Sequence, residues 1–268
     1  MSSLQQSVRS LLWKRHVPGY PLWLRLRCRR EHSALERTVF GIHFPHPVGL
    51  APVLEKQVEL LDECHALGFS FTGLIPGDTP VQTVAERLQQ RTTPIVASVE
   101  LRAEGDDEQK ALEVLVQQFS LLYDFTDYFV IDVNRESGLT SLDDFSDWTV
   151  LLDELLSLRL YYEKYRPILL RISPDHTEEQ MARILDFSLL SGFDGVVAPG
   201  IAKVRFCVAY TKNRIPIIGS GAITTPEEAI ALLQAGASLV EVAHGLKNRG
   251  LSCAKRLLQA IDNPQKQS

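Results

Sequence analysis

The stretch from Ile215 to Gly245 reads IPIIGSGAITTPEEAIALLQAGASLVEVAHG. It holds two short apolar runs, each ending in glycine, with a helical segment between them. Thr225 and Glu228 stand in capping-box register at the start of that segment, and Gly236 follows its end. This order predicts a strand, a capped helix and a second strand, which is the repeating unit of α/β folds with a parallel sheet.

Six further apolar runs of similar length precede this stretch. The eight runs cover residues 48–53, 69–75, 95–101, 128–134, 168–173, 195–200, 216–222 and 239–245. Runs without polar alternation are typical of strands that are covered on both faces. Eight tandem strand–helix units in 268 residues predict a (β/α)8 TIM barrel, which typically needs about 250 residues. A doubly wound open sheet is the alternative.

The chain divides by composition into three expected parts. Residues 1–37 form a basic amphipathic helical extension with eight Lys or Arg and two Glu, a net charge of +6. Residues 38–262 form the barrel, which opens with an N-terminal β-hairpin turning at Gly41, and residues 263–268 form a disordered tail. The whole chain carries −5, so the remainder carries −11. We expect His43 and His46, beside the hairpin prolines, at the surface.

The charge pattern limits the kinds of binding partner that are expected. A basic, Trp- and Leu-rich arm fits either peripheral contact with an anionic membrane surface or packing on one end of the barrel. The acidic body argues against nucleic-acid binding. No apolar run reaches the ~18 residues of a membrane span, and the N-terminus lacks a secretory signal pattern. Four scattered cysteines predict reduced thiols in a cytoplasmic protein, with membrane association left open. The residues indicate no metal site, and the oligomeric state is left open.

The glycines at the run ends predict a phosphate site. GSG at 219–221 ends the seventh run, and HG at 244–245 ends the eighth. The loops after strands seven and eight of such barrels commonly bind phosphate. Glycine allows backbone N–H groups to approach an anion closely, and a following helix N-terminus favours negative charge. Glycines that only end strands in tight turns are the alternative.

Three segments together resemble one family. They are FGIHFPHPVGLAPVLEK (40–56), LLRISPDHTEEQM (169–181) and IPIIGSGAITTPEEAIALLQAGASLVEV (215–242). They resemble, in order and spacing, segments of the quinone-linked, class 2-like dihydroorotate dehydrogenases, and the resemblance extends from about residue 20 to 262. The basic arm resembles the helical N-terminal extension of that family.

The resemblance implies a flavin mononucleotide (FMN) oxidoreductase of pyrimidine biosynthesis on a barrel fold. It places Ala51 and Lys56 beside the flavin ring and Arg171 at the position of the fifth-strand lysine. The phosphate end would be formed by Gly219, Ser220, Gly221, Ala222, His244 and Gly245.

The departures from the family pattern concern the dihydroorotate side. In IDVNRESGLTSL (131–142), Arg135 and Glu136 stand where the catalytic serine and a proline are expected, and Ser137 is a poor substitute in this register. The asparagine-rich loop after the second strand and the glycine-rich loop before the seventh are missing. The resemblance therefore implies a divergent, shortened member that has lost the dihydroorotate site, and we assign no catalytic residue. The alternative is a non-catalytic barrel, a pseudoenzyme that binds a phosphorylated ligand or a partner protein.

Charged residues at the strand ends need partners. Glu100 and Glu241 fall within apolar runs, and a carboxylate pointing into a barrel must be paired. Arg171 is the plausible partner, in a structural ion pair that would occupy space near a flavin. We expect Asp132 and Asn134 to cap the turn after the fourth run, with a general base as the alternative.

Overall fold

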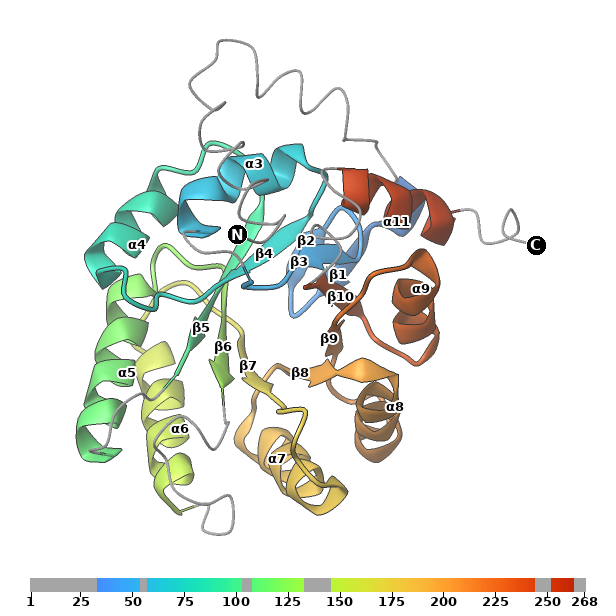
Figure 1. The fold of residues 1–268 in the computed structure, drawn as a ribbon. Coiled ribbons are helices and arrows are strands. Elements are labelled where there is room, and N and C mark those ends of the chain that lie inside the picture. The colour runs from blue at the N-terminus through green and yellow to red at the C-terminus, as the bar shows by residue number, and fades with distance from the viewer. Residues whose placement is uncertain (1–32, 54–56, 103–107, 133–145, 244–251, 263–268) are drawn as a thin grey trace.

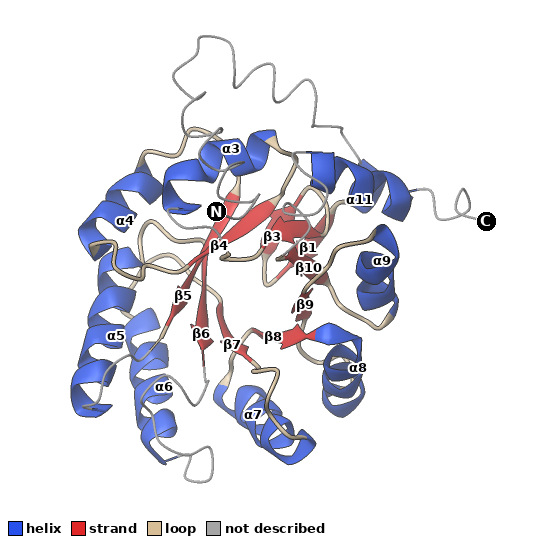
Figure 2. Cartoon of the chain, viewed as in Figure 1, coloured by secondary structure: helices blue, strands red, loops and turns tan. Residues whose placement is uncertain are grey.

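Eight parallel strands form a closed barrel that is surrounded by helices (Figure 1 and Figure 2). The computed structural model describes residues 33–53, 57–102, 108–132, 146–243 and 252–262. In barrel order the strands are β10 (Leu239–Val242), β3 (Val48–Leu50), β4 (Phe71–Leu74), β5 (Val96–Leu101), β6 (Tyr128–Asp132), β7 (Ile168–Arg171), β8 (Gly195–Pro199) and β9 (Ile217–Gly221). The predicted TIM barrel is confirmed, and the open-sheet alternative is excluded.

The helices follow the strands along the chain. They are η1 (Ser33–Leu35), η2 (Gln57–Leu60), α3 (Leu61–Ala66), α4 (Val81–Gln89), α5 (Glu108–Leu122), α6 (Ser146–Arg159), α7 (Glu178–Ser191), α8 (Gly200–Thr211), α9 (Pro226–Gln234) and α11 (Cys253–Asp262). Both α7 and α9 begin with a complete capping box, in which Thr177 pairs with Gln180 and Thr225 with Glu228. The sequence pattern predicted the start of α9 correctly.

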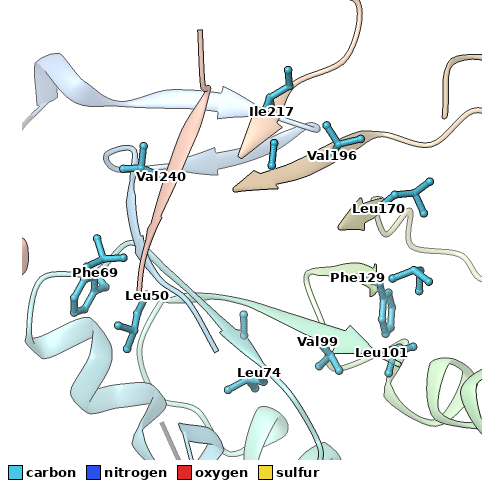
Figure 3. Close-up of a cluster of buried hydrophobic side chains, with 14 of the residues drawn as sticks. Leu50, Phe69, Leu74, Val99, Leu101, Phe129, Leu170, Val196, Ile217 and Val240 are labelled. Atoms are coloured by element: carbon cyan, nitrogen blue, oxygen red, sulfur yellow. The ribbon is translucent and has the colours of Figure 1, made fainter. Parts of the chain in front are cut away.

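Apolar side chains fill two separate layers because neighbouring residues of a strand point to opposite faces. Outward-facing residues such as Leu50, Val99 and Val196 pack against the helices, and Figure 3 shows this layer on the strands. The inner layer fills the barrel with Val39, Phe44, Phe71, Val96, Tyr128, Val130, Leu169, Val197, Ile218 and Leu239. Both faces of each strand are therefore buried, which explains the continuous apolar runs.

A β-hairpin, β1 (Arg37–Val39) and β2 (Ile42–Phe44), packs against the inner layer of the barrel. Its turn places Phe40 and Gly41 at positive φ, 55° and 79°. The ring of Phe44 meets Phe71 edge-on at 5.5 Å, and Phe40 lies 6.1 Å from Tyr128. Phe71 and Tyr128 begin their strands, so the hairpin closes the N-terminal end of the barrel and leaves the C-terminal end for a ligand.

Two further expectations meet the structure here. His43 is exposed as predicted, but His46 is 7% exposed, so its prediction as a surface residue is wrong. Its Nδ1 accepts a hydrogen bond from Val48 N, and its carbonyl accepts one from Ser70 Oγ, which ties the chain into the start of β3. Among the described residues, no helix combines the length and the hydropathy that crossing a bilayer requires. The predicted extension lies outside the described residues up to residue 32, and its role stays a prediction.

Candidate functional site

The candidate site lies at the C-terminal ends of the barrel strands, which we call the mouth. Active sites of (β/α)8 barrels are built at this end, and the hairpin closes the other. The described residues of the mouth form two unlike halves. Uncharged residues end β3, β8, β9 and β10, and glycines lie at the end of β9 and directly after β8, so we call this side the small half. Charged side chains lie at or beside the ends of β5, β6 and β7, and one more projects from β10.

The small half exposes backbone at two neighbouring turns. Gly221 ends β9 at φ 147°, and a Cβ built on it would lie 3.7 Å from Gly200 N. Gly200 begins α8 at φ 73°, and a Cβ built there would meet nothing within 4 Å. Both glycines therefore border open space. Pro199 at the N-cap of α8 makes no side-chain capping bond, so the first N–H groups of α8 have no side-chain cap.

The helix after β9 differs from α8. Glu228 accepts hydrogen bonds from Thr224 N and Thr225 N, and Thr225 caps Glu228 N. The capping box thus occupies the N-terminal end of α9, and Glu227 adds a second carboxylate to its first turn. Near Gly221, the helix N-terminus without a side-chain cap is therefore that of α8. This helix follows the sixth barrel strand, whereas α9 follows the seventh.

The predicted residues of the seventh strand take different positions. Ser220 is buried on the inner face opposite Glu241, whereas Ala222 is exposed. Gly219 faces outward, where a Cβ would lie 3.2 Å from both Ala237 Cβ and Leu232 Cδ2. The absence of a side chain at Gly219 therefore allows α9 to pack closely on β9.

Ala51 is buried at the end of β3, and the side chain of Gln57 holds this segment in place. Gln57 Nε2 donates to Ala51 O at 3.0 Å, to Thr72 Oγ1 at 2.7 Å and to Gly73 O at 2.8 Å. Its Oε1 accepts from Val53 N at 3.1 Å. Gln57 was not predicted as a site residue, because a glutamine after a loop lysine carries no sequence signal for these four hydrogen bonds.

The charged half contains a connected cluster of five side chains, which we call the mouth cluster. Arg171 Nε lies 2.7 Å from Glu100 Oε2, and Arg171 Nη2 lies 3.2 Å from Glu241 Oε2. Arg102 Nη2 lies 2.6 Å from Glu100 Oε1, and Arg102 Nε lies 3.2 Å from Asp132 Oδ2. The predicted pairing of Arg171 with the buried carboxylates is confirmed. The pairing of Asp132 with Arg102 was not predicted.

Burial and charge set the protonation of this cluster. Burial opposes the charge on Arg171, but Glu100 and Glu241 hold its pKa above the ordinary value. Burial raises the pKa of Glu241, and the charge of Glu100 adds to the effect, although Arg171 opposes it. Among the described residues, Glu241 Oε1 has no hydrogen-bond partner. Burial therefore favours the protonated form of Glu241.

A cavity of about 210 Å³ adjoins the mouth cluster between β4, β5 and α5. Its walls are Ile75, Pro76, Gly77, Glu100, Arg102, Val114 and Gln118. The remaining predicted residues, Lys56, His244 and Gly245, lie outside the described residues, as do Asn134, Arg135, Glu136 and Ser137.

Comparisons with known proteins agree with this geometry. A family model described as dihydroorotate dehydrogenase matches residues 196–264, from β8 to beyond α11. Curated quinone-dependent dihydroorotate dehydrogenases from Christiangramia forsetii and Trichormus variabilis are each 27% identical to the chain. The first alignment covers 91% of this chain and 89% of the relative, and the second covers 96% and 88%. Along most of its length the chain is therefore similar to quinone-dependent dihydroorotate dehydrogenases, at an identity that marks a divergent relative.

Solved structures support the barrel fold of the chain. Ligand-free dihydroorotate dehydrogenase from Eimeria tenella superposes with a TM-score of 0.79 at 21% identity, over 92% of this chain and 93% of that one. A mandelate oxidase superposes with a TM-score of 0.56 at 15% identity, over 85% and 75%. The C. forsetii alignment spans 304 positions yet only 91% of the 268 residues of this chain, so that relative contains insertions that this chain lacks.

Proposed function

We propose that the protein is an FMN-dependent oxidoreductase of the dihydroorotate dehydrogenase type whose dihydroorotate site has been altered. The observation that carries this proposal is the open, glycine-lined space where the ends of β8 and β9 meet, in a chain aligned nearly end to end with quinone-dependent dihydroorotate dehydrogenases. Flavin mononucleotide needs a dianion site at one end and a wall for its ring at the other.

The described residues fit the phosphate end. Gly200 and Gly221 border open space and Ala222 is exposed, so their backbone would be the part of the chain that meets an anion. The N-terminus of α8, which has no side-chain cap, favours negative charge there. His244 and Gly245 would complete this end. Ala51, fixed by Gln57, and Lys56 would border the ring. The bound flavin would supply the two-electron acceptor that no side chain provides. The protein's part is to bind, orient and screen it from water.

The charged half supports the altered substrate site. Both guanidinium groups of the mouth cluster contact carboxylates, and the three carboxylates of this cluster leave it without excess positive charge for the carboxylate of dihydroorotate. In the sequence, Arg135 and Glu136 replace the residues that carry the family's base. We therefore expect dihydroorotate to reduce the bound flavin very slowly or not at all.

A non-catalytic barrel is the second candidate, and the position of Arg171 between Glu100 and Glu241 favours it. In this reading the small half of the mouth binds a phosphorylated ligand, and the mouth cluster is a structural closure of the barrel. The two candidates share the phosphate site and differ in whether a flavin ring is bound.

The visible spectrum separates the two candidates. The purified protein is titrated with FMN, and the flavin absorbance and fluorescence are followed. Saturable quenching with a perturbed spectrum supports the oxidoreductase, whereas a colourless protein after reconstitution rules it out. Ala222→Asp, which adds a negative charge beside Gly221, should weaken FMN binding at least tenfold, or about 1.4 kcal/mol. Ala209→Asp, at an exposed position near the end of α8, is the matched control.

A further inference from the structure

We propose that the closed end of the barrel carries a self-association surface, through which two copies of this chain form a two-fold symmetric dimer. The centre of this surface is Leu160, Tyr161, Tyr165 and Leu190, which we call the rim patch. It lies at the end of the barrel opposite the mouth, so the inference goes beyond the proposed function and does not depend on it.

The rim patch lies where α6 and α7 end. Leu160 and Tyr161 directly follow α6, Tyr165 precedes β7 by three residues, and Leu190 is in the last turn of α7. Each helix returns the chain to the start of the next parallel strand, so the ends of α6 and α7 lie at the N-terminal ends of the neighbouring strands β7 and β8 (Figure 1). The four side chains are 84%, 86%, 58% and 86% exposed. Large apolar side chains that gather in one place mark an interaction site, whereas single ones do not.

A hydrogen-bonded group holds the two sides of the rim patch together. Arg159 Nη1 donates to the Tyr165 hydroxyl at 3.0 Å and to Asp194 Oδ2 at 2.8 Å. The Tyr165 hydroxyl donates to the other carboxylate oxygen of Asp194, which follows α7. The backbone N–H of Tyr161 donates to Leu158 O at 3.0 Å, which continues the last turn of α6. Apolar groups that are held in place before association lose little conformational freedom on binding.

The charges of the loop between α6 and β7 point to a second copy as the occupant. Arg166 lies 3.9 Å from Asp127, and the exposed charged residues of this loop are Glu163 and Lys164, which are adjacent and of opposite sign. An anionic membrane or an acidic partner protein would instead be matched by a surplus of positive charge. A two-fold axis places this loop opposite its own copy, so that Glu163 of each chain can face Lys164 of the other.

The exposed tyrosines supply a substantial part of the area that a dimer needs. A buried aromatic side chain contributes about 150–250 Å², so Tyr161 and Tyr165 together present roughly 300 Å² at their observed exposure. Each partner of a standard interface contributes about 800 Å². Leu160, Leu190 and the polar side chains around them would supply the remainder. Tyrosine is also among the residues that dominate the binding energy of interfaces.

The mass of the full chain in solution tests the proposal. Sedimentation equilibrium or light scattering is measured from ~1 to ~100 μM protein, and we expect the mass to rise from one chain toward two. Leu190→Arg and Tyr161→Arg should each raise the dissociation constant of the dimer at least tenfold. Both side chains are exposed, so both variants should fold, which circular dichroism checks. The mass of one chain at ~100 μM would overturn the proposal.

Val150→Arg is the matched control for the position of the surface. Val150 is 66% exposed and lies near the start of α6, roughly 15 Å along the helix from Leu160. The control should leave the dissociation constant unchanged. A loss of dimer equal to that of Leu190→Arg would show that the contact is not at the rim patch.

Reversed charges test the two-fold pairing. Glu163→Lys or Lys164→Glu alone places like charges opposite each other and should weaken the dimer about threefold. The variant with both changes restores opposite signs and should associate within about twofold of the wild type. A double variant that is no tighter than the single variants would refute the pairing.

A membrane as the occupant gives the opposite result for one variant. Tyr161→Arg adds positive charge, so it should weaken a dimer but strengthen attachment to vesicles that contain phosphatidylserine. Flotation of wild-type protein with such vesicles, together with stronger flotation of Tyr161→Arg, would assign the rim patch to a lipid surface and overturn the proposal. None of these measurements depends on flavin, so their failure leaves the FMN proposal untouched.

Discussion

Arg171 Nε on β7 lies 2.7 Å from Glu100 Oε2 on β5, across the strand that separates them in the barrel wall. The contact is possible because both side chains point into the barrel, where Arg171 also reaches Glu241 on β10. One guanidinium thus links three strands at the mouth. Its removal leaves the buried Glu241 without this cation, while Glu100 keeps its contact with Arg102.

We expect Arg171→Met to lower the free energy of unfolding by about 3–5 kcal/mol, because breaking a buried pair strands the opposite charge. Urea unfolding followed by circular dichroism measures this change. Arg183→Met, which breaks an exposed pair on α7, should change stability by less than about 0.5 kcal/mol. Equal effects of the two variants would show that the mouth cluster contributes no more than a surface pair.

The stability conferred by Glu241 should depend on pH. Burial raises its pKa in the folded state above the ordinary value of 4.5, so the folded protein holds this proton more tightly than the unfolded chain. The resulting stabilisation is complete below that value and is lost as pH rises through the folded-state pKa. The stability of the wild type relative to Glu241→Gln should therefore fall as pH rises from 4.5. Urea unfolding of both proteins across that range checks the sign, and a rising difference would contradict it.

Gln57→Leu should destabilise the protein by about 2–3 kcal/mol, because it leaves buried acceptors at Ala51, Thr72 and Gly73 without their donor. If FMN binds as proposed, its affinity should fall as well, since the wall at Ala51 loses its support. Gln89→Leu, at an exposed position at the end of α4, is the control for a general effect of the substitution. Unchanged stability of Gln57→Leu would show that the loop holds its shape by other contacts.

Gly49→Ala should destabilise the barrel by about 1–3 kcal/mol, because the new methyl group would overlap the ring of Phe71. Phe71→Leu replaces that ring with a smaller side chain and should restore part of the stability that Gly49→Ala loses. The double variant should therefore lose less stability than the sum of the two single variants, which a double-mutant cycle of unfolding free energies measures. Strict additivity would mean that the two positions do not compete for the same space.

The fold was predictable from sequence because its signals are local. Buried parallel strands leave continuous apolar runs, and the Thr225–Glu228 capping box marks a helix start within four residues. The pairing of Arg171 was predictable because a carboxylate inside a barrel requires a cation and few candidates exist. The pairing of Arg102 with Asp132 and the contacts of Gln57 were not predictable, because they depend on which strand ends meet in space.

The effect of the α9 capping box on anion binding was also not predicted from the sequence. The pattern identified Thr225 and Glu228 correctly, but their hydrogen bonds occupy the helix end that was expected to attract phosphate. The uncapped end belongs to α8, whose first residue, Gly200, adjoins Gly221 only in the folded barrel. The predicted roles of Lys56, His244 and Gly245 stay predictions.

The aromatic hairpin, residues 37–44, affects how ligands enter and leave the barrel. With Phe40 and Phe44 packed against the first residues of the strands, the described residues leave the C-terminal end of the barrel as the entrance for a ligand. If two ligands bind one above the other and share this entrance, they must be released in a fixed order. The outer compound must depart before the inner one is released, so an excess of the outer compound should slow the escape of the inner.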